Sequence, residues 1–118
     1  MPQITVDYSA VLSEGFDRPT FAKALHEEVV RTAAAKPEAC KTQFRATDDT
    51  VVGPDTDGHA IVHITLGLLA GRTDDTKVTL TENVLELVRQ YVKASAGLAL
   101  HVSAEVRDLD PSYRKFEV

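Results

Sequence analysis

The sequence contains a single cysteine, Cys40, in 118 residues. One cysteine cannot form a disulfide within the chain, so we expect a cytoplasmic protein in which Cys40 is a small half-buried side chain rather than a nucleophile. No segment approaches the roughly 20 consecutive apolar residues of a membrane-spanning helix. The first residues show neither a basic region nor an apolar core, so we expect no secretory signal.

Excess positive charge is also lacking. The chain carries 13 Lys and Arg residues against 18 Asp and Glu, a formal net charge of −5, which argues against nonspecific binding to nucleic acid or to anionic membranes. A small anionic substrate is compatible with this charge, because a few arginines can dominate the potential inside one cleft. The four histidines show no metal-ligand spacing, and neither a glycine-rich phosphate loop nor a nucleophile elbow occurs. We therefore predict no metal site.

The length suits one domain, residues 1–118, and two similar halves divide it at roughly residues 2–48 and 59–109. In the first half, apolar residues alternate in a predicted strand over residues 2–8, with Ile4, Val6 and Tyr8 on one face. Residues 20–35 have the spacing of an amphipathic helix that Asp17 and Pro19 begin and Pro37 ends. Residues 41–47 alternate again and predict a second strand.

A turn-rich acidic loop over residues 48–58 separates the halves. The second half begins with a strong strand pattern over residues 59–69. Thr73 is a suitable N-cap for a helix that we expect to run to about Ala96. Its predicted buried stripe consists of Val78, Thr81, Val84, Leu85, Val88, Tyr91 and Val92. A last strand is predicted over residues 98–106.

Each half therefore has the order strand, helix, strand. We predict an α+β fold with a duplicated β-α-β unit, in which a four-stranded mixed sheet carries both helices on one face. The other face would expose semi-polar side chains: Thr5, Gln43, Arg45, His63, Thr65, His101 and Ser103. A bare face of this kind favours self-association, although an ordinary two-layer sandwich with one wet face fits the periodicity equally well.

Pro2 is the most distinctive residue of the first strand. Met1 is normally removed when a small residue follows it, and we then expect Pro2 to carry a free secondary amine. An α-amino group has a pKa of about 7.7–8.0, which burial or nearby cations depress, so Pro2 is a candidate general base. The alternative is a structural proline at the start of a strand, where a missing N–H costs nothing.

The two halves, the Met1-Pro2 start and the segment Leu69-Ala70-Gly71-Arg72-Thr73-Asp74-Asp75 together resemble the tautomerase superfamily, and most closely its 5-carboxymethyl-2-hydroxymuconate isomerase family. The resemblance covers nearly the whole chain. Its most distinctive stretch is Ala60-Ile61-Val62-His63-Ile64-Thr65-Leu66 running into Ala70-Gly71-Arg72. It implies a homotrimer with active sites near the subunit boundaries. It also implies cofactor-free transfer of a proton within an unsaturated keto or enol acid.

The resemblance assigns roles to three residues of this sequence. Pro2 matches the catalytic N-terminal proline base of the family. Arg45 is similar to the catalytic arginine that binds a substrate carboxylate or polarises its carbonyl oxygen. Arg72 matches a second, substrate-binding arginine, and its alternative role is an exposed arginine before a helix. Since only the first half offers a free amine, we expect one active site per subunit.

The expected function is an isomerase that acts on 5-carboxymethyl-2-hydroxymuconate in the bacterial breakdown of homoprotocatechuate, as the resemblance implies. A broader keto-enol tautomerase acting on phenylpyruvate is a second possibility. The third is an oligomeric binding protein that uses the same fold without catalysis, as a chain that retains Met1 would indicate.

Overall fold

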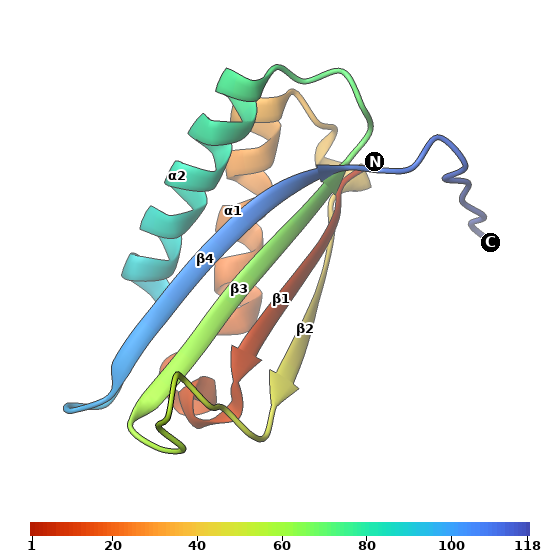
Figure 1. Ribbon diagram of the computed structural model, residues 1–118. Helices are drawn as coiled ribbons and strands as arrows, with labels where there is room; N and C mark the ends of the chain where they lie inside the picture. The colour runs from red at the N-terminus through yellow and green to blue at the C-terminus, as the bar shows by residue number, and fades with distance from the viewer.

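The computed structural model describes all residues, 1–118 (Figure 1). The strands are β1 (Gln3–Ser9), β2 (Lys41–Thr47), β3 (His59–Leu68) and β4 (Ala99–Asp108), and the two long helices are α1 (Arg18–Ala33) and α2 (Asp74–Tyr91). Short 3₁₀ helices, η1 (Ala10–Gly15) and η2 (Pro37–Ala39), follow β1 and precede β2. The sheet has the order β2-β1-β3-β4. Its outer pairs are parallel and its central pair is antiparallel. Both helices cover one face, so the predicted α+β fold is confirmed.

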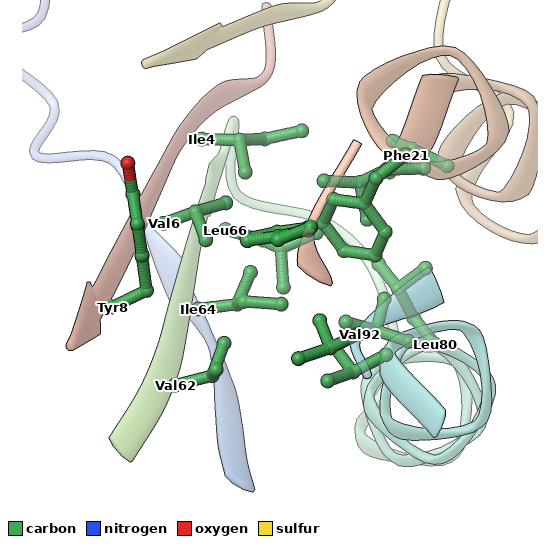
Figure 2. Close-up of a cluster of buried hydrophobic side chains, with 14 of the residues drawn as sticks. Ile4, Val6, Tyr8, Phe21, Val62, Ile64, Leu66, Leu80 and Val92 are labelled. Atoms are coloured by element: carbon green, nitrogen blue, oxygen red, sulfur yellow. The ribbon is translucent and has the colours of Figure 1, made fainter. Parts of the chain in front are cut away.

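The core lies between this face and the helices. Figure 2 shows Ile4, Val6, Ile64 and Leu66 pointing from the sheet toward Phe21 of α1, and all five side chains are at most 2% exposed. Full burial of each such side chain contributes about 1.5–3 kcal/mol relative to exposure. The predicted face of β1 is therefore confirmed, and the inward faces of β1 and β3 fix which side chains remain on the opposite face.

The opposite face of the sheet is open in the single chain, and the polar residues predicted for it lie there. Several of them pair across strands. Arg45 donates two hydrogen bonds to the Asp7 carboxylate, at 2.7 and 3.1 Å. His63 Nδ1 lies 2.6 Å from Ser103 Oγ, and His59 Nδ1 lies 2.9 Å from His101 Nε2. The single chain thus presents a broad polar surface that is internally hydrogen-bonded.

The second helix differs from the prediction at both ends of its buried stripe. It ends at Tyr91 rather than near Ala96, because Val92 adopts an extended conformation and forms a β-bridge with Phe16. The following backbone N–H, of Lys93, donates to the Gly15 carbonyl at 2.9 Å. Val78 was expected to be buried, yet it is 54% exposed, and Leu80 takes the first buried position instead. Tertiary pairing thus overrides helix periodicity in the last turn.

Two polar side chains of α1, one buried and one half-buried, make hydrogen bonds to other elements. Glu28 is only 4% exposed, and it accepts hydrogen bonds from Arg31, Thr32 and, at 2.9 Å, Asn83 of α2. Burial raises the pKa of Glu28, but the bonds from Thr32, Asn83 and Arg31 outweigh burial, so that its pKa lies below 4.5. His26 Nε2 lies 2.7 Å from Thr42 Oγ1 of β2, and burial lowers the pKa of this histidine.

The topology gathers several chain segments at one end of the sheet. Gln3 at the start of β1 pairs with Lys41 at the start of β2 and with Gly67 near the end of β3. Residues 34–40, which lead from α1 into β2, and residues 69–73, which lead from β3 into α2, must therefore lie beside Pro2. No helix in the structure combines the length and apolar character needed to cross a membrane.

Glu28→Gln should lower the free energy of unfolding at pH 7 by about 1–3 kcal/mol, because a neutral amide cannot satisfy the same three donors. The pKa of Glu28 in the folded protein is lower than its ordinary value of 4.5. The stabilisation by the Glu28 carboxylate is therefore fully present above pH 4.5, and it is lost as the pH falls through the folded-state pKa. Urea unfolding at pH 7 and at pH 3 measures both effects. The exposed neighbour provides the control, Glu27→Gln, and an equal loss of stability in both variants would contradict this role.

Candidate active site

Pro2 forms part of the wall of a cleft of about 220 Å³ at this end of the sheet. The proline is buried, and its carbonyl accepts a hydrogen bond from the Lys41 backbone N–H at 3.2 Å. This bond is the first rung of the β1–β2 pairing and fixes the start of the chain. Small and apolar residues line the rest of the cleft together with two cationic side chains: Met1, Ala34, Ala35, Lys36, Ala39, Leu69 and Arg72.

The environment of the cleft favours an uncharged amine. Burial lowers the pKa of the Met1 amino group below 8.0, and the positive charges of Arg72 and Lys115 lower it further. Cys40 acts in the opposite direction, and Lys41 makes a smaller contribution in the same direction as Arg72. When Met1 is removed, the amine moves to Pro2, one residue or about 3.8 Å along the chain, among the same cations.

Arg72 lines the same cleft as Pro2, and it also joins two elements. Its Nε and Nη2 both donate to the Ala33 carbonyl, at 3.0 and 2.9 Å, and its Nη1 donates to the Leu69 carbonyl at 3.0 Å. Ala33 is the last residue of α1, where a cation complements the negative end of the helix dipole. A guanidinium has five N–H donors, so two of them remain for another acceptor. Arg72 therefore stabilises the fold through three hydrogen bonds to backbone carbonyls and still has two N–H groups that can bind a ligand.

Lys36 is a second cation on the wall of the cleft, and the sequence analysis did not assign it a role. It follows α1 and precedes η2, immediately before β2. A topological signal could have found it: because β2 runs parallel to β1, the residues that enter β2 must lie beside the residues that enter β1. Lys36 and Pro2 are such residues.

Arg45 does not lie in this cleft. Arg45 on β2 lies opposite Asp7 of β1 in the sheet register. Asp7 is five residues beyond Pro2, so Arg45 lies about 16 Å from Pro2 along the strand direction. Its side chain is exposed on the open face and forms an ion pair with Asp7. Within one chain, the structure therefore brings Pro2 and Arg72 together and leaves Arg45 apart.

The two ends of the sheet differ in their charged side chains. Lys36, Lys41, Arg72 and Lys115 surround the start of β1, whereas the 48–58 loop at the far end carries four aspartates. The cleft end also carries acidic residues, among them Asp74 and Asp75 at the start of α2 and Asp108 at the end of β4. The cations on the wall of the cleft are nevertheless suited to bind a small anion.

The opposite end provides an internal comparison, because the second β-α-β half begins there. A hollow of about 220 Å³ beside the start of β3 is lined by hydroxyl and acidic side chains, among them Ser9, Thr50, Asp48 and Asp57. It contains neither an amine nor a lysine or arginine. No three His, Cys, Asp or Glu side chains lie in an arrangement able to hold a metal ion, in this hollow or elsewhere. Only the Pro2 end combines a base with cations.

The chemical capacity of the cleft follows from these groups. An uncharged amine accepts a proton, and cations close to it bind carboxylates and stabilise an enolate oxygen. The alanines and Leu69 provide an apolar surface for a carbon chain.

The chain was compared with known families and structures. The model of the 5-carboxymethyl-2-hydroxymuconate isomerase family matches residues 2–117. A comparison with curated protein sequences gives no significant match. Among solved structures, a 5-carboxymethyl-2-hydroxymuconate isomerase from Deinococcus radiodurans R1 is similar, with a TM-score of 0.80 and 16% identity over 98% of this chain and 90% of that one.

Two further structures have the same fold. A protein described as a W0 fused 4-OT wild type symmetric trimer gives a TM-score of 0.77 at 17% identity, over 98% of this chain and 93% of that one. FG41 malonate semialdehyde decarboxylase inhibited by 3-bromopropiolate gives 0.70 at 23% identity, over 98% and 89%. The family match spans nearly the whole sequence, and the cleft with its buried Pro2 agrees with it: the chain belongs to the 5-carboxymethyl-2-hydroxymuconate isomerase family and is an isomerase.

Proposed function

We propose that this isomerase moves a proton within an unsaturated 2-hydroxy or 2-oxo polycarboxylic acid, with 5-carboxymethyl-2-hydroxymuconate as the preferred substrate and without a cofactor. The observation that carries the proposal is the position of Pro2, buried in the wall of a cleft that also contains Arg72 and Lys36. The substrate comes from the family to which the chain belongs. The same family membership supports a place in the bacterial breakdown of homoprotocatechuate.

Pro2 acts as the base once Met1 has been removed. Its nitrogen lone pair accepts a proton from one atom of the conjugated substrate, which leaves a delocalised enolate and a protonated amine. The new N–H then returns the proton to a carbon at the other end of the conjugated system, so the amine is regenerated. The cations that lower the pKa of the Met1 amine in the structure would act on Pro2 in the same way. A base with a pKa near the working pH can both take and return the proton.

Arg72 and Lys36 bind the negative charges of the substrate. Arg72 retains two donors after its three bonds to the backbone, enough for one bidentate carboxylate contact. Lys36 lies on the same wall and can neutralise a second carboxylate or the developing enolate oxygen. A polyanion therefore has two cationic partners in the cleft, whereas a monoacid uses only one of them.

Arg45 reaches the substrate from a neighbouring copy. Its distance from Pro2 along the strand rules out a contact within one chain, yet it lies on the open sheet face, which is suited to self-association. Two similar structures are described as symmetric trimers, which supports a homotrimer. In that assembly Arg45 would exchange Asp7 for a substrate carboxylate across the boundary. One active site per subunit follows, because each copy supplies one Pro2.

Pro2→Ala should lower kcat/KM for 5-carboxymethyl-2-hydroxymuconate by about 10²–10⁴-fold, the usual contribution of a positioned general base. The loss of ultraviolet absorbance of the dienol measures the rate. Intact-mass spectrometry on the wild type must first show a chain that lacks one methionine. Undiminished turnover by Pro2→Ala, or full turnover by a chain that retains Met1, would rule out the assigned base.

Arg45→Ala should lower kcat/KM about 10–100-fold for 5-carboxymethyl-2-hydroxymuconate, which carries three carboxylates. The loss should be much smaller for the enol of phenylpyruvate, because a single carboxylate does not need the additional cation. Steady-state rates on both substrates test this difference. If the wild type is faster on phenylpyruvate than on 5-carboxymethyl-2-hydroxymuconate, a broader keto-enol tautomerase is the better description of its function.

Mixed oligomers test whether Arg45 acts across the boundary. Pro2→Ala and Arg45→Ala chains are each impaired alone, but after they are unfolded together and refolded, some sites receive an intact Pro2 from one copy and an intact Arg45 from another. Recovery of activity in the mixture supports a shared site. If the mixture is no more active than the average of its parents, Arg45 does not act from a neighbour.

A further inference from the structure

The largest hollow of the chain adjoins the cleft that contains Pro2. It has a volume of about 510 Å³ and lies between the end of α1 and the start of α2, so we call it the α1–α2 hollow (Figure 1). Ala34 and Arg72 line both the hollow and the cleft, and the two spaces therefore meet at these residues. The cleft alone, at about 220 Å³, is smaller than the roughly 300–1,000 Å³ of a small-molecule site. Together the two spaces reach that range.

Arg72 is the only charged side chain that lines the α1–α2 hollow. Its three bonds to backbone carbonyls leave two N–H groups for a ligand. Asp74 and Asp75 in the first turn of α2 are exposed and do not belong to the lining, so solvent screens their effect on an anion held by Arg72. The hollow is therefore suited to a carboxylate.

Thr76 offers a second donor to the same space. Thr73 Oγ1 donates to Thr76 Oγ1 at 3.0 Å and accepts from the Thr76 backbone N–H at 3.1 Å. The Thr76 oxygen is the acceptor of this pair, so its own hydroxyl hydrogen is free to turn toward a ligand in the hollow that Thr76 lines. Thr32 also lines the hollow, but its hydroxyl already donates to Glu28. A guanidinium and a free hydroxyl thus line one space and can share one carboxylate.

Ala34 marks the junction of the two spaces by its backbone. It is the only residue other than glycine with a positive φ, at 56° with a ψ of 36°. This conformation at the end of a helix usually belongs to glycine, because a Cβ atom is strained there. The Ala34 side chain is exposed, so packing in the core does not account for it. Strained residues of this kind cluster at ligand sites, and the Ala34 methyl lies in the wall of both spaces.

We propose that the α1–α2 hollow is a second subsite, which binds the carboxymethyl arm of the substrate. Arg72 and Thr76 bind the carboxylate of this arm, and the Ala34 methyl contacts its methylene carbon. The conjugated chain of the substrate is planar and lies beside Pro2, whereas the arm branches through a saturated carbon and can bend past Arg72. The inference rests on the proposed function and makes Thr76 a specificity-determining residue for the third carboxylate.

Thr76→Val removes the hydroxyl donor at nearly constant side-chain volume. The KM for 5-carboxymethyl-2-hydroxymuconate should rise about tenfold while kcat stays within about twofold, because the arm lies away from the reacting atoms. The inhibition constant of 2-hydroxymuconate, which is the same molecule without the arm, should rise much less. Steady-state kinetics with 2-hydroxymuconate as the competitor measure both constants. Thr81→Val is the matched control, because Thr81 is also on α2 and lines neither space.

Ala34→Gly should separate stability from substrate binding. The midpoint of thermal unfolding should rise by roughly 2–4 °C as the left-handed strain is relieved. The KM for 5-carboxymethyl-2-hydroxymuconate should nevertheless rise about fourfold, the contribution of one buried methyl group. Ala94→Gly, at an exposed alanine between α2 and β4 whose φ is not positive, is the control and should lower the midpoint without changing KM.

The possible failures are distinguishable. If Thr76→Val changes the constants for both compounds equally, or changes neither, the hollow does not bind the arm. An Ala34→Gly chain that gains stability with an unchanged KM would likewise place the hollow outside the path of the substrate. In both cases a loss of activity in Pro2→Ala leaves the proposed function standing. If instead Pro2→Ala retains full turnover, the proposed function itself fails, whatever Thr76→Val does to KM.

Discussion

The parallel pairing of β1 with β2 is the constraint on which the rest of the molecule depends. Its first rung is the hydrogen bond from the Lys41 N–H to the Pro2 carbonyl. A parallel pair needs a crossover, and α1 supplies it, so the end of α1 and the approach to β2 return to the level of Pro2. Because β3 runs antiparallel to β1, the end of β3 lies beside the start of β1, and the loop that follows β3 places Arg72 near Pro2. A slip of one residue in this pairing would turn Pro2 out of the cleft and move the cations away from it.

Electrostatics and packing support each other at this end of the sheet. The carboxyl end of α1 attracts cations, and Arg72 satisfies its last carbonyl while retaining donors for a ligand. The same positive charge lowers the pKa of the Met1 amino group nearby. Anion binding and base strength thus arise from one arrangement of charge. The acidic loop at the opposite end leaves the chain negative as a whole without weakening the cleft, because exposed charges more than about 10 Å apart are largely screened.

The sequence allowed the fold to be predicted, because the fold depends on alternation, helix spacing and the order of elements. The roles of Pro2 and Arg72 come from the family resemblance and stay predictions, and the structure places both residues in one cleft. Where tertiary contacts override the local pattern, prediction failed: Val92 leaves the helix to pair with Phe16. The burial of Glu28 likewise depends on Asn83 of the other helix, which no local pattern reveals. Lys36 was missed although the predicted β-α-β unit already places the residues that enter β2 beside those that enter β1. Arg45 lies outside the cleft because its strand carries it toward the far end, so a role for it requires a second copy of the chain.

The central claim is that a free secondary amine at Pro2 is kept uncharged by burial and by the cations around it. The most direct measurement is a pH titration of the Pro2 nitrogen by NMR in chains labelled with ¹⁵N-proline. We expect one resonance to titrate with a pKa below the ordinary α-amino range of about 7.7–8.0. A Pro2 resonance that does not titrate would mean that the nitrogen remains in a peptide bond with Met1. That result, or titration at or above the ordinary range, would contradict the account.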